Sequence, residues 1–183
     1  MTLYILRHAS AGTRRANPVL DVKRPLDKDG KRHCLLLGHA LTALKINFDV
    51  VISSPLKRAV QTASLVGTET GYEQRIVLSE GLSPAANYEA FEKLLATCSH
   101  EENVLLVGHN PNLPAFIGRL LTGGGRIGKP AAIRMRKGSI AKISTDRAVG
   151  QNGPTLQWLM EPRMARALYA TSTKSSRRKT SRK

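Results

Sequence analysis

Hydrophobic and polar positions fall into blocks along the chain, and the blocks have the lengths of strands and helices. Short apolar runs predict strands, and they lie at residues 2–6, 48–52, 76–78, 103–107, 139–144 and 155–160. Longer segments with helical spacing lie at residues 27–44, 54–65, 88–95 and 113–121. Because strands alternate with helices, we expect an α/β fold with a largely parallel sheet.

Two of these helices open with the same signal, a capping residue followed by proline. Ser54-Pro55 and Asn110-Pro111 both fit it, because proline suits the first helical position, where no backbone N–H is needed. We therefore expect Asn110 to be a helix cap. By contrast, residues 9–25 are polar and contain no strong periodicity, which predicts a long loop of the kind that often carries function.

Charge adds a second boundary to this picture. The 183 residues include 29 Lys and Arg against 13 Asp and Glu, which gives a formal net charge of +16. The end of the chain, from Thr171 to Lys183, is basic and has no acidic residue, a composition typical of disorder. We expect one domain at residues 1–165 and a basic, disordered tail at 166–183. A chain this basic favours anionic partners, and the tail would contact anionic surfaces.

The apolar segments are too short for a membrane span. The longest, residues 35–44, is interrupted by Gly38 and His39, and the N-terminal run lacks the pattern of a signal peptide. We expect a cytoplasmic, monomeric protein.

Candidate chemistry follows three of the predicted strands, at the point where each one ends. These places are Leu6-Arg7-His8, the segment from Ile52 to Arg58, and Val107-Gly108-His109. In open α/β sheets, ligands bind at the carboxyl ends of the strands. The three segments should therefore meet at one edge of the sheet, although His8 and His109 are far apart in sequence.

Two histidines, two arginines and two helix starts at one point predict a phosphate site. Arginine forks bind phosphate oxygens in pairs, and helix N-termini favour anions. A neutral imidazole can attack phosphorus, provided that its other nitrogen is held as N–H. His8 is the better nucleophile candidate and His109 the candidate charged donor, although geometry alone would allow the opposite roles. This chemistry requires no metal and no cofactor, and the sequence has no metal-type Cys/His spacing.

Four motifs in this order resemble the SixA-type phosphohistidine phosphatases, a branch of the histidine phosphatase (phosphoglycerate mutase-like) superfamily. The resemblance covers about residues 1–162. The motifs are Arg7-His8-Ala9-x-Ala11, Arg24-Pro25-Leu26, Ser53-Ser54-Pro55-x-x-Arg58-Ala59-x-Gln61-Thr62 and Val107-Gly108-His109-Asn110-Pro111.

The resemblance implies both a fold and a set of roles. The fold is a three-layer phosphoglycerate mutase-like α/β domain, with helices on both faces of a mostly parallel sheet that has one antiparallel strand. His8 becomes the phosphorylated nucleophile, Arg7, Arg58 and His109 bind phosphate, and Arg24 lies near the pocket. Many members of the superfamily also have a carboxylate that protonates the leaving group. Glu80 is the nearest candidate for that general acid here.

These observations favour a metal-independent phosphatase that acts on a phosphohistidine-carrying signalling protein. An imidazole leaves with far less help from an acid than an alkoxide does, so a site without a clear acid suits phosphohistidine. Small-molecule phosphomonoesterase activity is the first alternative. A non-enzymatic module that binds phosphate or nucleic acid is the second, and a mutase is a third.

Overall fold

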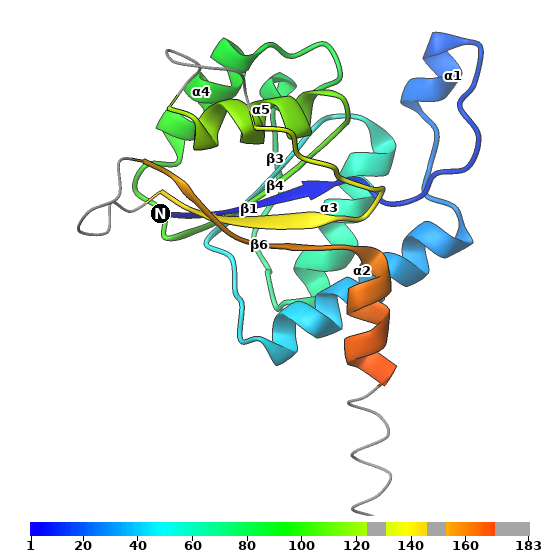
Figure 1. Cartoon of the computed structure of the whole chain (residues 1–183). Helices are drawn as coiled ribbons and strands as arrows, with labels where there is room; N and C mark the ends of the chain where they lie inside the picture. Colours follow the sequence, from blue (N-terminus) through cyan, green and yellow to red (C-terminus); the bar gives the residue numbers. More distant parts are fainter. Residues whose placement is uncertain (124–130, 146–152, 171–183) are drawn as a thin grey trace, which may run out of the picture.

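The computed structural model describes residues 1–123, 131–145 and 153–170. These residues form a six-stranded sheet in the order β3-β2-β4-β1-β5-β6 (Figure 1). The strands are β1 (Thr2–Arg7), β2 (Val50–Ser53), β3 (Val77–Leu78), β4 (Asn103–Gly108), β5 (Ile140–Ser144) and β6 (Thr155–Met160). β5 pairs antiparallel with both β1 and β6, whereas all other pairs are parallel. The sheet therefore has the single antiparallel strand that was expected.

Helices cover both faces of this sheet, which gives three layers (Figure 1). The helices are α1 (Pro18–Val22), α2 (Lys28–Ala43), α3 (Lys57–Glu69), α4 (Tyr88–Thr97) and α5 (Asn112–Leu121), and residues 80–82 form a 3-10 turn. Residues 162–170 are also helical, so the boundary expected at 165 falls within a helix. The tail from residue 171 and the glycine-rich residues 124–130 lie outside the described part of the chain.

The central strands are apolar throughout because both of their faces are buried. In β1, Tyr4 and Leu6 join the core under α2 and α3, and Leu3 and Ile5 join the core under α4 and α5. The continuous run of apolar residues that marked this strand in the sequence reflects burial on two sides. None of the described helices is long and apolar enough to cross a membrane.

The segment after β1 is fixed by the start of α2. Asp27 caps α2 by accepting from the N–H of Gly30, and its other oxygen accepts from the hydroxyl of Ser10 and the N–H of Gly12. One carboxylate thus begins a helix and holds the backbone that follows His8. The predicted helix start at Asp27 is confirmed.

Two other predicted helix starts are wrong, and so is the loop predicted for residues 9–25. α3 begins at Lys57, without a side-chain cap: the hydroxyl of Ser54 contacts the ring of His109 and accepts from the N–H of Leu56, which precedes the helix. α5 begins at Asn112, and Asn110 is not its cap: its Nδ2 donates to the carbonyl of Met135, and its Oδ1 has no partner among the described residues. Residues 9–25 contain the short helix α1, which Asn17 caps.

The close packing of α2 on the segment after β1 predicts a large cost for Gly30→Ala. A methyl group at Gly30 would overlap the carbonyl oxygen of Ser10, so we expect a loss of about 2 kcal/mol in the free energy of unfolding. Gly67→Ala in α3 is the matched control: the nearest atoms to its methyl group, in Tyr72, lie at an ordinary 3.6 Å, so this variant should gain up to about 1 kcal/mol. Urea denaturation measures both, and equal effects would contradict the packing described.

Candidate active site

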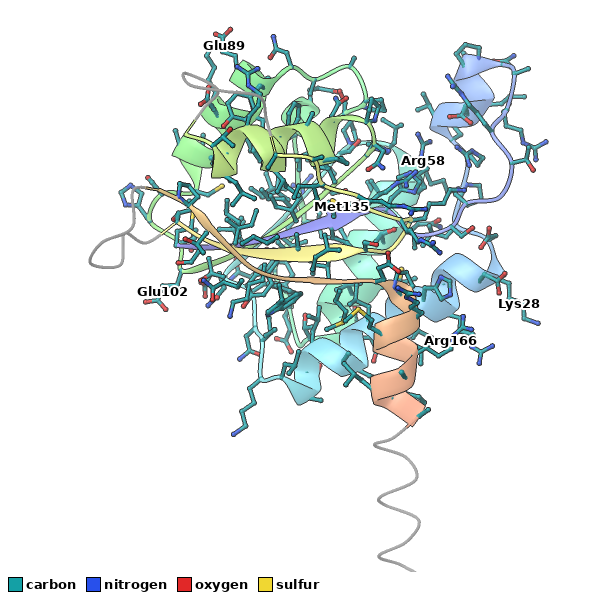
Figure 2. The ribbon with its side chains drawn as sticks, viewed as in Figure 1. Lys28, Arg58, Glu89, Glu102, Met135 and Arg166 are labelled. Carbon is teal, nitrogen blue, oxygen red and sulfur yellow. The ribbon has the colours of Figure 1, made fainter. Side chains whose placement is uncertain are left out.

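The register of three neighbouring strands assembles the site. β2, β4 and β1 are adjacent and parallel, and Arg7 pairs with Gly108 while Ser53 pairs with Val107. The residues that follow these strands therefore leave the sheet side by side. Figure 2 shows Arg58 at this end of the sheet, whereas Glu102, which precedes β4, lies at the opposite end. The convergence that the sequence predicted is confirmed for His8, His109 and Arg58.

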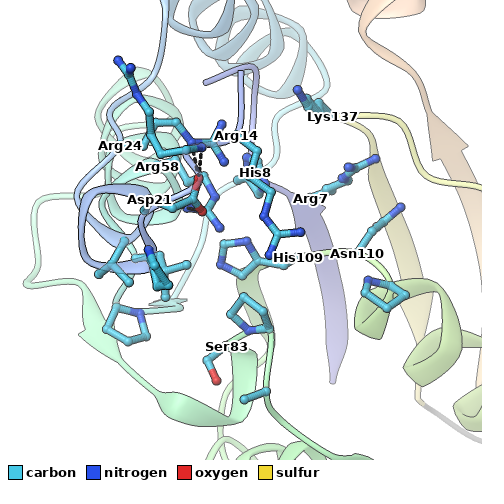
Figure 3. Close-up of a pocket in the computed structure, with 18 of the residues that line it drawn as sticks. Arg7, His8, Arg14, Asp21, Arg24, Arg58, Ser83, His109, Asn110 and Lys137 are labelled. Atoms are coloured by element: carbon cyan, nitrogen blue, oxygen red, sulfur yellow. Dashed lines mark hydrogen bonds and ion pairs between the residues drawn. The ribbon is translucent and has the colours of Figure 1, made fainter. Parts of the chain in front are cut away.

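These residues line one open pocket of about 1180 Å³ (Figure 3). Arg7, His8, Arg58 and His109 form its floor: His8, Arg58 and His109 are buried, and Arg7 is half-buried. The rings of His8 and His109 lie 4.9 Å apart between centroids. The four side chains that the sequence singled out thus meet in one place.

His8 is held in a single orientation. Its Nδ1 lies 2.8 Å from the carbonyl oxygen of Ala9, so Nδ1 carries the proton and donates to that oxygen. Nε2 is left with its lone pair. The N–H of Ala9 in turn donates to the hydroxyl of Thr62, which donates to the carbonyl of Arg58 on α3. This chain of contacts links the His8 backbone to the helix that carries Arg58.

His109 makes a different contact. Its Nε2 lies 2.9 Å from the hydroxyl oxygen of Ser54, and its Nδ1 is buried with no partner among the described residues. The Ser54 hydroxyl can donate to Nε2, which places the ring proton on Nδ1. Sequence reasoning took Ser54 for a helix cap and missed this contact, because only the tertiary structure brings residues 54 and 109 together.

Buried donors without partners point to an anion. The Nε atoms of Arg7 and Arg58 also have no partner among the described residues. Arg7 is held through Nη1, which donates to the carbonyl of Met135. Buried N–H groups are rarely left unsatisfied in proteins, and guanidinium and imidazole donors together match the oxygens of a phosphate.

Electrostatics keep both imidazoles neutral. Burial lowers the pKa of His8 to about 3, assisted by the positive charges of Arg58, Arg7 and Lys137, although the Ala9 carbonyl opposes this shift. Burial and the neighbouring His8 and arginines also lower the pKa of His109 to about 3. The charged His109 expected from the sequence is thus not favoured by the protein alone. A phosphate dianion would raise that pKa, because opposite charges stabilise each other.

Arg24 lies at the pocket, as expected, but most of its contacts are within the protein. Its guanidinium binds Asp21 at 2.9 Å and donates to the carbonyls of Ala11 and Gly12. Asp21 also approaches Arg58: its backbone oxygen accepts from Nη1 at 3.0 Å, and its carboxylate lies 3.5 Å away. The N–H of Arg15, with Arg24 and Arg58, lowers the pKa of the Asp21 carboxyl group. The sequence analysis did not find Asp21, although its spacing of three residues from Arg24 allows an ion pair.

The pocket rim carries further charge. Arg14, Arg15 and Lys137 line it and are exposed, and sequence reasoning did not select them. Glu80 also lines the pocket, in the 3-10 turn after β3, where its side chain is exposed. Within the described residues, no group of three or more His, Cys, Asp or Glu side chains is arranged to hold a metal ion.

The lowered histidine pKa values predict a fall in stability with acid. Unfolded histidine binds a proton below a pKa near 6.5, whereas folded His8 and His109 do so only near pH 3. Between these values the unfolded chain holds more protons, so the free energy of unfolding should decrease as the pH falls from 6.5 towards 3. Urea unfolding at pH 7 and pH 5 measures the decrease. It should be smaller in His8→Gln, and an equal decrease in this variant would show that His8 is not the cause.

Comparisons with known proteins agree with this geometry. Residues 3–94 match the family model described as histidine phosphatase superfamily (branch 1). The phosphohistidine phosphatase SixA of Escherichia coli is 26% identical over 173 residues, which cover 92% of this chain and 100% of that protein.

Solved structures give the same result. A structure of the protein histidine phosphatase SixA complexed with tungstate has a TM-score of 0.74 and 26% identity, over 88% of this chain and 97% of the other. A phosphoglycerate mutase from Bacillus anthracis has a TM-score of 0.63 at 18% identity, over 90% and 95% of the two chains, and thus shares the fold. The chain has the phosphoglycerate mutase-like fold and belongs to the histidine phosphatase superfamily (branch 1), as a phosphatase similar to SixA.

Proposed function

We propose that this chain hydrolyses phosphohistidine on a signalling protein, in two steps and without a metal, through a phosphorylated His8. The observation that carries the proposal is the fixed tautomer of His8. The Ala9 carbonyl holds the proton on Nδ1, and the lowered pKa keeps Nε2 unprotonated. A buried imidazole with a free lone pair, set among donors that have no partner in the described part of the chain, is a nucleophile placed for phosphorus.

In the first step, Nε2 of His8 attacks the phosphorus atom. A bond forms between Nε2 and phosphorus while the bond to the leaving imidazole breaks, and the leaving nitrogen takes the electron pair and then a proton. Arg7, Arg58 and His109 bind the three equatorial oxygens, over which the transition state spreads its negative charge. The site is rigid before the reaction because Arg7 and His109 are already anchored, through Met135 and Ser54 respectively.

In the second step, water attacks phosphorus and the bond to His8 breaks. Nε2 regains its lone pair, and inorganic phosphate leaves with the oxygen and one proton of the water. The other proton passes to solvent and replaces the one that the leaving imidazole took from solvent in the first step. The hydrogen bond from Nδ1 to Ala9 is present throughout, so His8 begins the next cycle in the same tautomer. No step requires a redox change or a second substrate besides water.

The chemistry of the leaving group favours phosphohistidine over phosphate esters. An alkoxide needs a proton donor in the transition state, whereas an imidazole departs with little help. Of the two carboxylates among the described pocket residues, Asp21 is paired with arginines, and Glu80 is exposed at the rim, away from the buried histidines. The names of the SixA relatives support the same substrate class.

Small phosphomonoesters are the alternative substrates, and the open pocket favours this second reading because it would admit them freely. A binding module without catalysis is a weaker alternative. Phosphate binding alone would be served by arginines and would not need His8 held with one nitrogen free.

The proposal predicts a phosphoenzyme on His8. Rapid quenching with a phosphorus-32-labelled phosphohistidine protein, in the presence of a chelator, should yield protein-bound label that is stable in base and labile in acid. Mapping should place the label on His8, and His8→Ala should abolish both label and turnover. An alkyl phosphate should be hydrolysed far more slowly. Equal rates would favour the phosphomonoesterase, and label on another residue would overturn the mechanism.

The contact between Ser54 and His109 predicts a specific catalytic loss. In Ser54→Ala, the Nδ1 proton of His109 is no longer fixed, so kcat should fall about tenfold, the equivalent of one hydrogen bond. Ser54→Thr keeps the hydroxyl and should recover most of the activity. Ser53→Ala is the matched control, since the Ser53 hydroxyl donates to the carbonyl of Ser54 and makes no hydrogen bond to His109. Similar losses in both alanine variants would indicate a packing defect instead.

A further inference from the structure

Helix α1 exposes an apolar face beside the pocket. Val19, Leu20 and Val22 are 63%, 57% and 49% exposed, and no residue of this helix is buried. The helix stands away from the sheet, at the end where the site lies (Figure 1). Neighbouring large apolar side chains in water mark a surface that another molecule covers.

Polar contacts, and not apolar packing, hold α1 in place. Asn17 caps the helix by accepting from the N–H groups of Val19 and Leu20. At its other end, Asp21 binds Arg24 and Arg58 (Figure 3). The fold therefore does not use the side chains of Val19 and Leu20, and their apolar character has no role within the described chain.

The surroundings of this face favour an acidic partner. Pro18 and Val22 line the pocket, so the apolar face continues into the site. Six cationic side chains line the same pocket, against the two carboxylates of Asp21 and Glu80. Positive charge around an apolar patch complements a protein surface with acidic residues around apolar ones. A free phosphorylated metabolite would reach the floor of the pocket without contacting Val19 or Leu20.

We propose that Val19, Leu20 and Val22, with the cationic rim of the pocket, form the docking surface for an acidic phosphoprotein substrate. The inference rests on the proposed function and adds the surface that selects protein-borne phosphohistidine. The substrate's apolar patch packs on α1 while its phosphorylated side chain enters the pocket. Asp21 links α1 to Arg58, so a protein docked on α1 would contact a helix that is joined directly to one of the phosphate-binding arginines. Three side chains on a five-residue helix offer less area than a stable dimer needs.

The test compares two substrates in one double variant, Val19→Ser with Leu20→Ser. Both positions are exposed and neither lines the pocket, so folding and the site should be preserved. The protein probe is a small acidic carrier phosphorylated on one surface histidine with potassium phosphoramidate, and the small probe is free phosphohistidine. We expect kcat/KM for the carrier to fall about tenfold, as for loss of interface contacts, with no change for free phosphohistidine.

Leu44→Ser is the matched control. Leu44 is 51% exposed at the far end of α2 and should leave both reactions unchanged. A double variant that hydrolyses the carrier like the wild type would overturn the docking surface, as would equal losses on both substrates. The docking surface would also be overturned if the double variant hydrolysed the carrier normally but lost a dimer seen for the wild type in ultracentrifugation, or lost binding to phosphatidylglycerol vesicles. If the wild type hydrolyses neither phosphohistidine probe, the proposed function itself fails.

Discussion

The parallel register of β2, β4 and β1 is the constraint on which the rest of the structure depends. Because of this register, β1, β2 and β4 end at the same edge of the sheet. His8, His109 and the start of α3, which follow these strands, therefore lie side by side. Close packing in the two apolar cores fixes that register, because a one-residue shift would exchange side chains such as Tyr4 and Ile5 between cores that each fit only their own set. The packing of the aliphatic core thus determines the positions of the site residues at this edge.

Positive charge in a partly buried site costs free energy, but the same charge helps the proposed reaction. Burial and neighbouring arginines disfavour imidazolium, which leaves His8 with the lone pair that a nucleophile needs. The Nε atoms of Arg7 and Arg58 have no partner among the described residues, and an anion would supply one. One arrangement therefore favours both the neutral nucleophile and the charged substrate.

Segment 9–25 connects this site to the surface. Asp27 fixes its beginning against α2, and Asp21 fixes its helix against Arg24 and Arg58. The segment is therefore an ordered wall of the pocket, with an apolar outer face. The sequence pattern predicted a loop without secondary structure here. The segment nevertheless has a definite conformation, because the carboxylates of Asp21 and Asp27 each accept several hydrogen bonds.

The sequence by itself determined the strands, most helices and the four side chains at the floor of the pocket. Apolar runs of strand length and polar residues at their ends are local signals, and they are strong where burial is complete. Only the tertiary structure decided what Ser54, Asn110 and Asp21 do. Ser54 and Asn110 follow local capping rules in the sequence, but in the fold the Ser54 hydroxyl contacts the ring of His109, and the Asn110 amide N–H donates to the carbonyl of Met135. A hydrogen bond between residues 55 positions apart leaves no periodic trace in a sequence, because it depends on which strands become neighbours.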